Sequence, residues 1–268
     1  NGMLGWYMYT FLKNTKQYNV SGISRNEFDV YKSYINQTIN EDINRIISGY
    51  NLIINCIGIT NKRDVSSSEM FIVNSYFPCL IASIKDRKQV LIHPSTDCIF
   101  YGNGSMYTEN SLPESYNDYG LSKYLGESCK LKGENVFVYR TSIIGEYGKG
   151  SLIEWVKDNN NNVINGFTNH YWNGITCLEY IKIIEKNHIK NKLDNTNKIF
   201  IISSLYKNRP YITKYDLIKE IINIYNFNIK LIPIVTDNNC DRTMVSNIPF
   251  NYEKDLVIQL KEMYDFSN

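Results

Sequence analysis

A tyrosine and a lysine stand four residues apart in the segment "YGLSK", as Tyr119 and Lys123. On a helix, residues at this spacing lie one above the other on the same face. The lysine ammonium can then lie near the phenol, whose unperturbed pKa is about 10, and favour the phenolate. We expect this pair to give a proton to a carbonyl oxygen, a step that contributes roughly 10²–10⁴-fold in rate. By itself, the spacing is common on helix surfaces.

A second group of polar side chains follows the apolar run "VLIHP". Ser95, Thr96 and Asp97 come directly after it. Ligand groups in open α/β sheets lie at the carboxyl ends of the strands. We therefore expect Thr96 to orient the same carbonyl as Tyr119, with Ser95 and Asp97 beside the substrate. The end of this strand and the helix that follows it would then both contribute to proton donation to one carbonyl oxygen.

The opening segment "NGMLG" has the spacing of a phosphate-binding turn. Gly2 and Gly5 match the last two glycines of Gly-x-x-Gly-x-x-Gly, whose backbone N–H groups face a pyrophosphate. Because a Cβ would hold the phosphates away from the backbone, glycine is needed there. We expect Gly2, Met3, Leu4 and Gly5 to bind a dinucleotide. The first glycine and its preceding strand are absent, so we interpret the chain as a fragment that is less stable, and binds cofactor less well, than a longer form.

The end of the next expected strand, 18–24, bears on the choice of cofactor. Ser24 is followed by Arg25. An acidic residue at this place suits the ribose 2′-hydroxyl of NAD, whereas an arginine suits the 2′-phosphate of NADP. The pair favours NADP(H), with NAD(H) as the alternative. An ordinary surface arginine after a strand is the other interpretation.

Alternating strands and helices must position these side chains. The apolar runs "YNLIINCIG", "QVLIHPST", "NVFVYRTSII" and "KIFIISS" have the length of strands buried on both faces of a parallel sheet. Helical segments separate them, which predicts an α/β fold with a Rossmann-type doubly wound parallel sheet. After about residue 142 the alternation loosens, and we expect a small C-terminal α/β lobe.

Helix ends are marked by capping residues. Asn40 is expected to cap one helix, Thr213 and Asp216 stand in capping positions of a late helix, and a capping box runs from Ser66 to Glu69. The helix that starts at Ser66 contains a proline, Pro78, which predicts a kink or a tolerated break.

Composition excludes several classes of function. The 268 residues are 43% hydrophobic and 21% charged, with a net charge of +2. Basic residues are scattered, so we expect no nucleic-acid partner. No apolar run reaches the roughly 18 residues of a membrane span, and no signal peptide is evident. The six cysteines show no CxxC pair and no zinc-like spacing with the three histidines, which favours a reduced cytoplasmic protein without a metal.

The motifs together resemble a known family. "NGMLG", "INCIG", "VNSYFP", "STDCIF", "YGLSKYLGE" and "YRTSIIG" occur in the order of the extended short-chain dehydrogenases/reductases, and look most like the dTDP-4-dehydrorhamnose reductase group. The resemblance covers nearly the whole chain and is closest over 51–145. It implies an NADP-binding Rossmann domain over 1–142, continued by about 174–203. A sugar-nucleotide-binding lobe would comprise 143–173 and 204–268.

The resemblance also implies roles for the site residues. Tyr119 would donate the proton, Lys123 would hold the nicotinamide ribose and tune Tyr119, and Thr96 would align the keto oxygen. NADPH would supply hydride to C4 of a 4-keto-6-deoxy sugar linked to a nucleoside diphosphate, for surface polysaccharide synthesis. Further cofactor contacts fall on Cys56, Ile57, Gly58 and Asn74, and substrate contacts on Trp172, Asn173 and Arg242.

Two features depart from the rhamnose reductases. Ile143 stands where that group has an aromatic residue, which leaves the sugar open. Cys98 follows Thr96 by two residues, on the same side of an extended strand. The related GDP-fucose synthases use a cysteine at that spacing for epimerisation, although a buried apolar cysteine is the simpler interpretation. For Trp155, a core aromatic is likewise the simpler interpretation.

Three functions therefore remain open. The leading one is reduction of a nucleotide-sugar 4-keto group, and the second is combined epimerisation and reduction that uses Cys98. The third is a non-catalytic NADP-holding regulatory subunit, as in relatives that regulate methionine adenosyltransferase. A pure binding role does not require Thr96, Tyr119 and Lys123 together, which favours an enzyme. The partner is expected to be a nucleotide sugar, and a homodimer is compatible with the fold.

Overall fold

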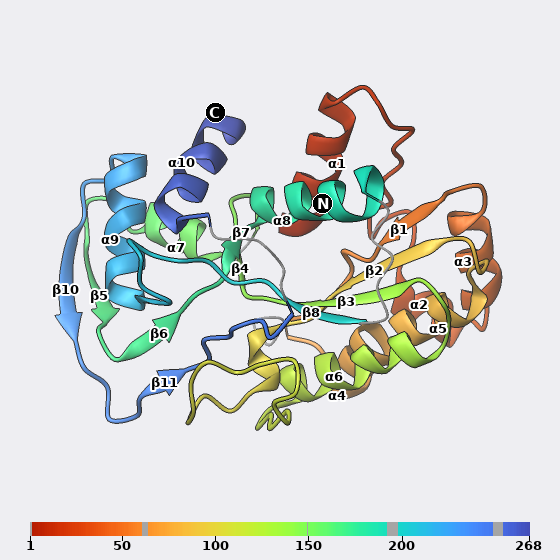
Figure 1. Cartoon of the computed structure of the whole chain (residues 1–268), viewed down its shortest axis with the longest axis horizontal. Helices are drawn as coiled ribbons and strands as arrows, with labels where there is room; N and C mark the ends of the chain where they lie inside the picture. Colours follow the sequence, from red (N-terminus) through yellow and green to blue (C-terminus); the bar gives the residue numbers. More distant parts are fainter. Residues whose placement is uncertain (1, 61–63, 149, 192–197, 249–253) are drawn as a thin grey trace.

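A parallel sheet of four strands forms the centre of the larger part of the molecule (Figure 1). The computed structural model describes residues 2–60, 64–148, 150–191, 198–248 and 254–268. Every neighbouring pair of strands in this sheet is parallel. In spatial order, the strands are β1 (Leu52–Ile54), β2 (Val90–Pro94), β3 (Val136–Arg140) and β8 (Ile199–Ile201).

Side chains of the central strand alternate between two apolar layers. On β3, Phe137 and Tyr139 pack into one buried cluster, whereas Val136 and Val138 pack into another. Successive side chains of a strand point to opposite faces, so a strand that is apolar throughout needs cover on both sides. The continuous apolar runs in the sequence correctly predicted this doubly covered sheet.

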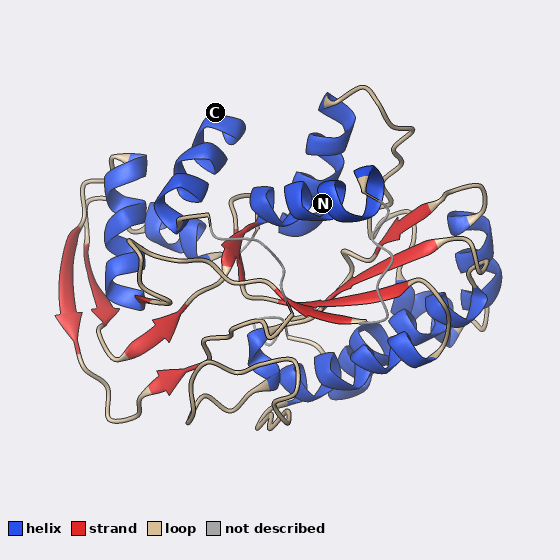
Figure 2. Ribbon diagram, in the orientation of Figure 1, coloured by secondary structure: helices blue, strands red, loops and turns tan. Residues whose placement is uncertain are grey.

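Helices cover both faces of the sheet (Figures 1 and 2). Side chains of α1 and α8 belong to the first buried cluster, and those of α3, α4 and α5 belong to the second. In chain order, the helices of this part are α1 (Met3–Asn14), α2 (Val30–Ile35), α3 (Ile39–Ile47), α4 (Ser67–Phe71), α5 (Phe77–Ile84), α6 (Asp118–Gly126) and α8 (Cys177–Ile184). Short 3₁₀ segments η2 (Asp97–Ile99) and η3 (Glu127–Leu131) flank α6.

A π-helical segment accommodates the proline predicted to disturb the long helix. The segment η1 (Ile72–Tyr76) joins α4 to α5, and Pro78 lies in the first turn of α5. The Phe77 N–H donates to the Ile72 carbonyl, five residues back. A proline cannot donate to the preceding turn, and the wider π-turn absorbs the missing bond. A second π-helical segment, η4 (Glu185–Lys190), extends α8.

Smaller sheets and three helices make up the other part of the molecule (Figure 2). Strands β5 (Val163–Phe167) and β10 (Lys230–Ile234) pair in parallel, and β11 (Cys240–Asp241), β6 (His170–Trp172) and β9 (Ile212–Thr213) form a mixed sheet. A third pair is β4 (Ile143–Ile144) with β7 (Ile175–Thr176). The helices are α7 (Leu152–Asp158), α9 (Lys214–Tyr225) and α10 (Leu256–Ser267).

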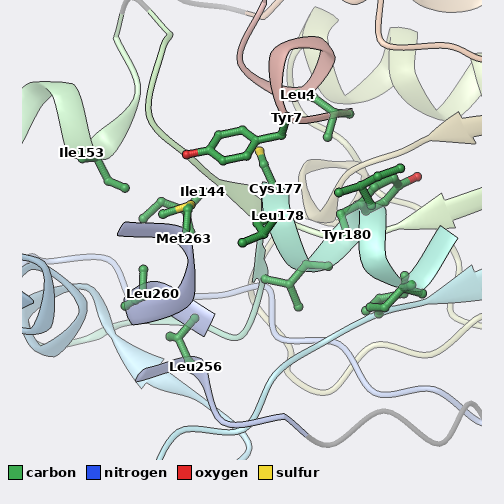
Figure 3. Packing of buried hydrophobic residues seen from close by; sticks show 14 of the residues in the cluster. Leu4, Tyr7, Ile144, Ile153, Cys177, Leu178, Tyr180, Leu256, Leu260 and Met263 are labelled. Atoms are coloured by element: carbon green, nitrogen blue, oxygen red, sulfur yellow. The ribbon is translucent and has the colours of Figure 1, made fainter. Parts of the chain in front are cut away.

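One apolar cluster extends through both parts (Figure 3). Leu260 and Met263 of α10 are fully buried in it, together with Tyr7 of α1 and Leu178 of α8. The Tyr7 hydroxyl also bonds to the Ser267 hydroxyl at 2.9 Å. The last helix of the chain is thereby packed against the first.

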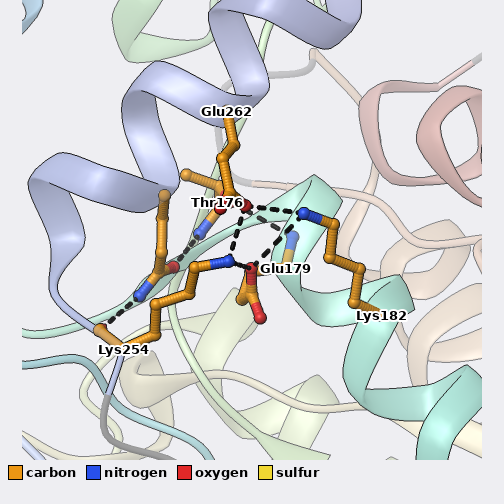
Figure 4. Close-up of polar contacts among 6 residues, drawn as sticks. Thr176, Glu179, Lys182, Lys254 and Glu262 are labelled. Carbon is orange, nitrogen blue, oxygen red and sulfur yellow. Dashed lines mark hydrogen bonds and ion pairs between the residues drawn. The ribbon is translucent and has the colours of Figure 1, made fainter.

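Charged side chains also connect α10, and Lys254 shortly before it, to α8 (Figure 4). Lys254 Nζ lies 2.6 Å from Glu262 and 3.1 Å from Glu179, and Lys182 Nζ lies 2.6 Å from Glu262. Three of these four side chains are partly exposed, and only Glu179 is buried. Their network therefore helps to orient α10 against α8 but contributes little to the free energy of folding.

Most predicted caps are confirmed and one is wrong. The side chains of Ser66 and Thr213 accept from the N–H groups three residues on. The helix expected to have Asn40 as its N-cap instead has Thr38 at that position, because α3 begins two residues earlier than expected. The strand expected over 18–24 is also wrong: this segment forms no strand. The residue types of this segment suggested a strand, but a local pattern could not supply a neighbouring strand for it to pair with.

Candidate active site

The loop after β2 carries Thr96, which was predicted to orient the same carbonyl as Tyr119. Ser95 continues the ladder of β2 through its N–H, which donates to the Tyr139 carbonyl at 2.7 Å. Thr96 then caps the 3₁₀ turn η2, because its hydroxyl accepts from the Cys98 N–H at 3.2 Å. This cap turns the chain at the carboxyl end of the sheet and fixes the Thr96 side chain there.

Helix α6 presents the tyrosine to the same place. Its N-cap is Asn117, whose side chain accepts from the Gly120 N–H at 2.9 Å. The helix start lies so close to the loop that a Cβ on Gly120 would come within 2.1 Å of the Cys98 carbonyl oxygen. This approach brings the Tyr119 phenol close enough to the Thr96 side chain for Thr96 to lower the pKa of the phenol. The structure therefore places together the two hydroxyls that the sequence predicted to share a carbonyl.

The phenol of Tyr119 is held in its neutral form. Burial raises the pKa of Tyr119 well above its ordinary value, and the nearby Cys98 and Asp97 raise it further, while Thr96 acts in the opposite direction. The expected shift of Tyr119 toward the phenolate is thus wrong for this structure. A protonated phenol remains a proton donor, which is the role the chemistry requires.

Lys123 lies one turn further along the same helix. It is 7% exposed, and its Nζ donates to the Pro94 carbonyl at 2.6 Å. Burial lowers the pKa of Lys123 to about 8, although Glu127 opposes the shift. The groups that act on the Tyr119 phenol are Cys98, Thr96 and Asp97, so the ammonium bonds to the end of β2 rather than to the phenol.

A buried ion pair lies behind the two hydroxyls. Arg140 and Glu127 are 3% and 1% exposed and approach to 2.8 Å. The Ser95 hydroxyl donates to the same Glu127 carboxylate at 2.6 Å. Such a pair is costly to break once buried, and here it ties β2 and β3 to the end of α6. Ser95, predicted to contact substrate, therefore bonds to this ion pair instead.

The opening turn has the features of a dinucleotide site. Gly2 is the N-cap of α1. No side chain caps this helix, and its first turn contains no acidic residue. A Cβ on Gly2 would meet nothing within 4 Å, whereas one on Gly5 would lie 3.5 Å from Cys56 Cβ. Free N–H groups at a helix start, in open space, fit a pyrophosphate. The side chains of Met3 and Leu4 belong to the packed apolar cluster, so their contribution to such a site is their backbone.

The predicted cofactor residues after β1 are brought together. Asn74 is 1% exposed, accepts from the Ile59 N–H at 2.9 Å and donates to the Ile59 carbonyl at 2.8 Å. It also donates to Ser122 on α6 at 3.0 Å. A Cβ on Gly58 would lie 3.5 Å from its amide oxygen. Asn74 thus holds the 56–59 segment against α6, and Ile57 is held from behind because its N–H donates to Asn55 at 3.1 Å.

The residues predicted to choose the cofactor already have acidic partners. Arg25 is paired with Asp29 at 2.8 Å and with Glu69 at 3.0 Å, while 55% of its side chain is exposed. Ser24 donates to Glu27 through its N–H at 2.8 Å and its hydroxyl at 2.7 Å. A 2′-phosphate would have to share the Arg25 guanidinium with two carboxylates. This arginine therefore already has anionic partners in the structure.

Arg242 reaches the Thr96 loop from the other part of the molecule. Its guanidinium donates to the Tyr101 carbonyl at 3.4 Å, to the Tyr116 hydroxyl at 3.2 Å and to Cys98 Sγ at 3.6 Å. Gly102, with φ +96°, makes room for it, because a Cβ there would lie 3.1 Å from Arg242 Cγ. The guanidinium therefore provides a positive charge on the side of the site where the substrate is predicted to bind.

Two other predicted substrate residues are engaged within the protein. Trp172 is 5% exposed, and its indole N–H donates to the Ser142 hydroxyl at 2.7 Å. Asn173 is 4% exposed and bonds to Met244 through both its N–H and its amide oxygen. Both residues hold the smaller part of the molecule together. Trp155, interpreted as a core residue, is instead 41% exposed.

Sequence reasoning missed Lys214, the first residue of α9. Its ammonium lies 5.3 Å from the centre of the Trp172 ring, and Asp97 and Cys98 both influence its pKa. Its position after the capping residue Thr213 carries no signal of a ligand, because surface lysines are common in such places. Only the packing of α9 brings it to the Thr96 loop.

Two negative findings apply to the part of the chain that the structure describes. No group of three or more His, Cys, Asp or Glu residues there is arranged to hold a metal ion. None of its helices has the length and apolar character needed to cross a lipid bilayer.

The parallel sheet with helices on both faces is the fold of the extended short-chain dehydrogenases/reductases. The family model described as "RmlD substrate binding domain" matches residues 1–162, and the chain belongs to that family. A comparison with curated proteins found no match.

Solved structures share the fold over nearly the whole chain. A dTDP-4-dehydrorhamnose reductase from Bacillus anthracis, in complex with NADP, has a TM-score of 0.82 at 19% identity, over 99% of this chain and 96% of that one. The Clostridium acetobutylicum dTDP-4-dehydrorhamnose reductase gives 0.80 at 18% identity, over 100% and 96%. The Yersinia enterocolitica dTDP-4-dehydrorhamnose reductase gives 0.76 at 19%, over 99% and 96%.

Proposed function

We propose that the protein reduces the 4-keto group of a nucleotide-activated 6-deoxy sugar with NADPH, as a dTDP-4-dehydrorhamnose reductase does. The observation that carries the proposal is the close approach of the start of α6, which carries Tyr119, to the loop that carries Thr96. A phenol that can act as the acid and a hydroxyl that can align the keto oxygen would then lie together at the carboxyl end of β2, where open α/β sheets bind their ligands. The similar solved structures support the same substrate class.

Each residue of the set has a distinct task. Tyr119 gives its proton to the keto oxygen, which becomes a hydroxyl as the carbonyl carbon is reduced. Thr96 orients that oxygen, and Lys123 supplies a buried positive charge one turn away. When bound, NADPH supplies the hydride. Gly2, Gly5 and the start of α1 would hold its pyrophosphate, with Gly58 and Asn74 alongside.

The division of labour between the two parts of the chain is also a proposal. Residues 1–142, continued by about 174–203, would bind the cofactor, and 143–173 with 204–268 would bind the sugar nucleotide. Arg242 supports this division, because it belongs to the second part and reaches Cys98 in the first. The acidic partners of Arg25 make NAD(H) a cofactor to test beside NADPH.

The experiment is a turnover assay across nucleotide-linked 4-keto sugars, followed by the loss of reduced-nicotinamide absorbance. We expect oxidation of NADPH with at least one member of the panel. Replacement of Tyr119 by Phe, which removes only the hydroxyl, should lower kcat at least ~100-fold and leave cofactor affinity unchanged. Turnover that survives in Tyr119→Phe would show that another group is the acid.

Combined epimerisation and reduction is a second candidate because of the position of Cys98. Its thiol influences the Tyr119 phenol and lies 3.6 Å from both Asp97 and Arg242. Burial raises the pKa of Cys98 to about 12, so the group is a neutral thiol. Unchanged product stereochemistry in Cys98→Ser would remove this candidate. A non-catalytic NADP-binding subunit predicts binding of NADPH without turnover of any sugar.

A further inference from the structure

Two cations from the smaller part of the molecule meet at the loop after β2. Lys214 opens α9, and its ammonium lies over the Trp172 ring at 5.3 Å. Arg242 lies 3.6 Å from the Cys98 sulfur of that loop. Burial lowers the pKa of Lys214, and Asp97, Cys98 and Arg242 each influence it. Lys214 directly follows β9 and Arg242 directly follows β11, and these two strands pair with β6 from either side, so the two cations share one neighbourhood, which Arg242 joins to the Thr96 loop.

The positive charge of this pair exceeds the negative charge around it. Among the described residues, the Lys214 ammonium makes no ion pair or hydrogen bond, and the Arg242 guanidinium bonds to a carbonyl, a phenol and a thiol. Asp97 is the carboxylate that acts on both cations. Two positive charges thus face one negative charge in partly buried surroundings. A half-buried ammonium that shares one carboxylate with a second cation and has no ion pair of its own is costly.

The local structure of α9 does not account for a lysine at this position. The N-terminal end of a helix carries a partial positive charge, so a cation in its first turn is unfavourable. Thr213 and Asp216 already cap this helix. An anion bound beside Lys214 would interact favourably with the ammonium and with the helix start together.

We propose that Lys214 is a further substrate-binding residue, which contacts the diphosphate of the nucleotide sugar together with Arg242. A diphosphate carries enough negative charge for both cations. The guanidinium offers a planar pair of donors, and the lysine a single mobile charge. This proposal rests on the proposed function, because it names residues for the substrate of the same site.

The test uses nucleoside diphosphates, so it does not depend on turnover. Binding of dTDP, UDP and GDP to the wild-type protein is measured by calorimetry, and the tightest binder is compared with its parent nucleoside. Lys214→Met keeps the length of the side chain and removes the charge, and Lys214→Arg keeps the charge. Lys219→Met is the matched control, because Lys219 lies on the same helix and is exposed.

We expect Lys214→Met to weaken binding of the diphosphate roughly tenfold, as loss of one charge-assisted contact does. Binding of the nucleoside and of NADPH should be unchanged, Lys214→Arg should retain most of the affinity, and Lys219→Met should match the wild type. Unchanged diphosphate affinity in Lys214→Met, with a lower melting temperature, would overturn the proposal and leave only a contact with Trp172. If none of the three diphosphates binds the wild type, the proposed function fails as well.

Discussion

At the scale of single residues, the site combines a neutral acid with a cation that is close to losing its proton. Burial raises the pKa of Tyr119, whereas burial lowers the pKa of Lys123 to about 8. Both shifts have one cause, because a low-dielectric environment disfavours the charged form of either group. Near neutral pH the phenol therefore keeps its proton and the amine keeps its charge, which suits donation by Tyr119.

The lowered pKa of Lys123 predicts a pH dependence of cofactor binding. Below about pH 8 the group is an ammonium, and as the pH rises through about 8 it loses the charge that would attract the cofactor. We expect NADPH affinity to fall across that range. The effect on folding has the opposite sign: the folded pKa lies below the unfolded one, so the cost of burying the charge is present below pH 8 and is relieved as the pH rises.

Cofactor titrations from about pH 7 to about pH 9.5, below the ordinary lysine pKa, would measure the dependence. Lys123→Met is the control, and it should bind NADPH weakly with no inflection near pH 8. An inflection of the same size in Lys123→Met would assign the titration to another group.

At the scale of the elements, the start of α6 lies unusually close to the Thr96 loop. A Cβ on Gly120 would come within 2.1 Å of both the Cys98 carbonyl oxygen and the Ser115 hydroxyl. Gly120 directly follows Tyr119. The glycine therefore permits the start of α6 to approach the loop closely enough for Tyr119 to lie beside Thr96. A larger residue must push the helix away from the loop or distort one of them.

Gly120→Ala should therefore impair both stability and the site. We expect a loss of about 1–3 kcal/mol in the free energy of unfolding, the usual cost of overpacking, and a fall in kcat because Tyr119 moves from Thr96. Denaturant unfolding and turnover measure the two effects. Leu121→Ala, at the adjacent and 40% exposed position, is the control and should change neither by much. Equal effects of both substitutions would mean that the close approach is unimportant.

At the scale of the whole molecule, α10 is packed onto the first helix and α8 although it ends the chain. Leu260 is fully buried in the cluster that also contains Tyr7 and Leu178. Removal of a buried leucine side chain typically costs about 2–5 kcal/mol. We expect Leu260→Ala to lower the free energy of unfolding by that amount, measured in denaturant. Ile258→Ala, on the same helix but 50% exposed, should cost much less, and a similar loss in both would contradict a core role for α10.

The sequence by itself determined most of the elements and the edge of the sheet at which we propose that the reaction takes place. Apolar runs and the caps at Ser66 and Thr213 are local features, and they correctly predicted a sheet covered by helices. The segment 18–24 was misjudged because a strand also needs a neighbour, and no local pattern supplies one.

Only the tertiary structure decided which groups each side chain meets. Ser95 bonds to Glu127, Arg25 to Glu69, and Lys214 lies over Trp172, all partners far away in the sequence. The direction of the Tyr119 pKa shift was decided in the same way, because the phenol is buried and the lysine one turn away bonds to the Pro94 carbonyl instead. Hydrophobic periodicity indicates which face of an element is covered. Which side chains cover it, and how much water they exclude, depends on packing between distant segments.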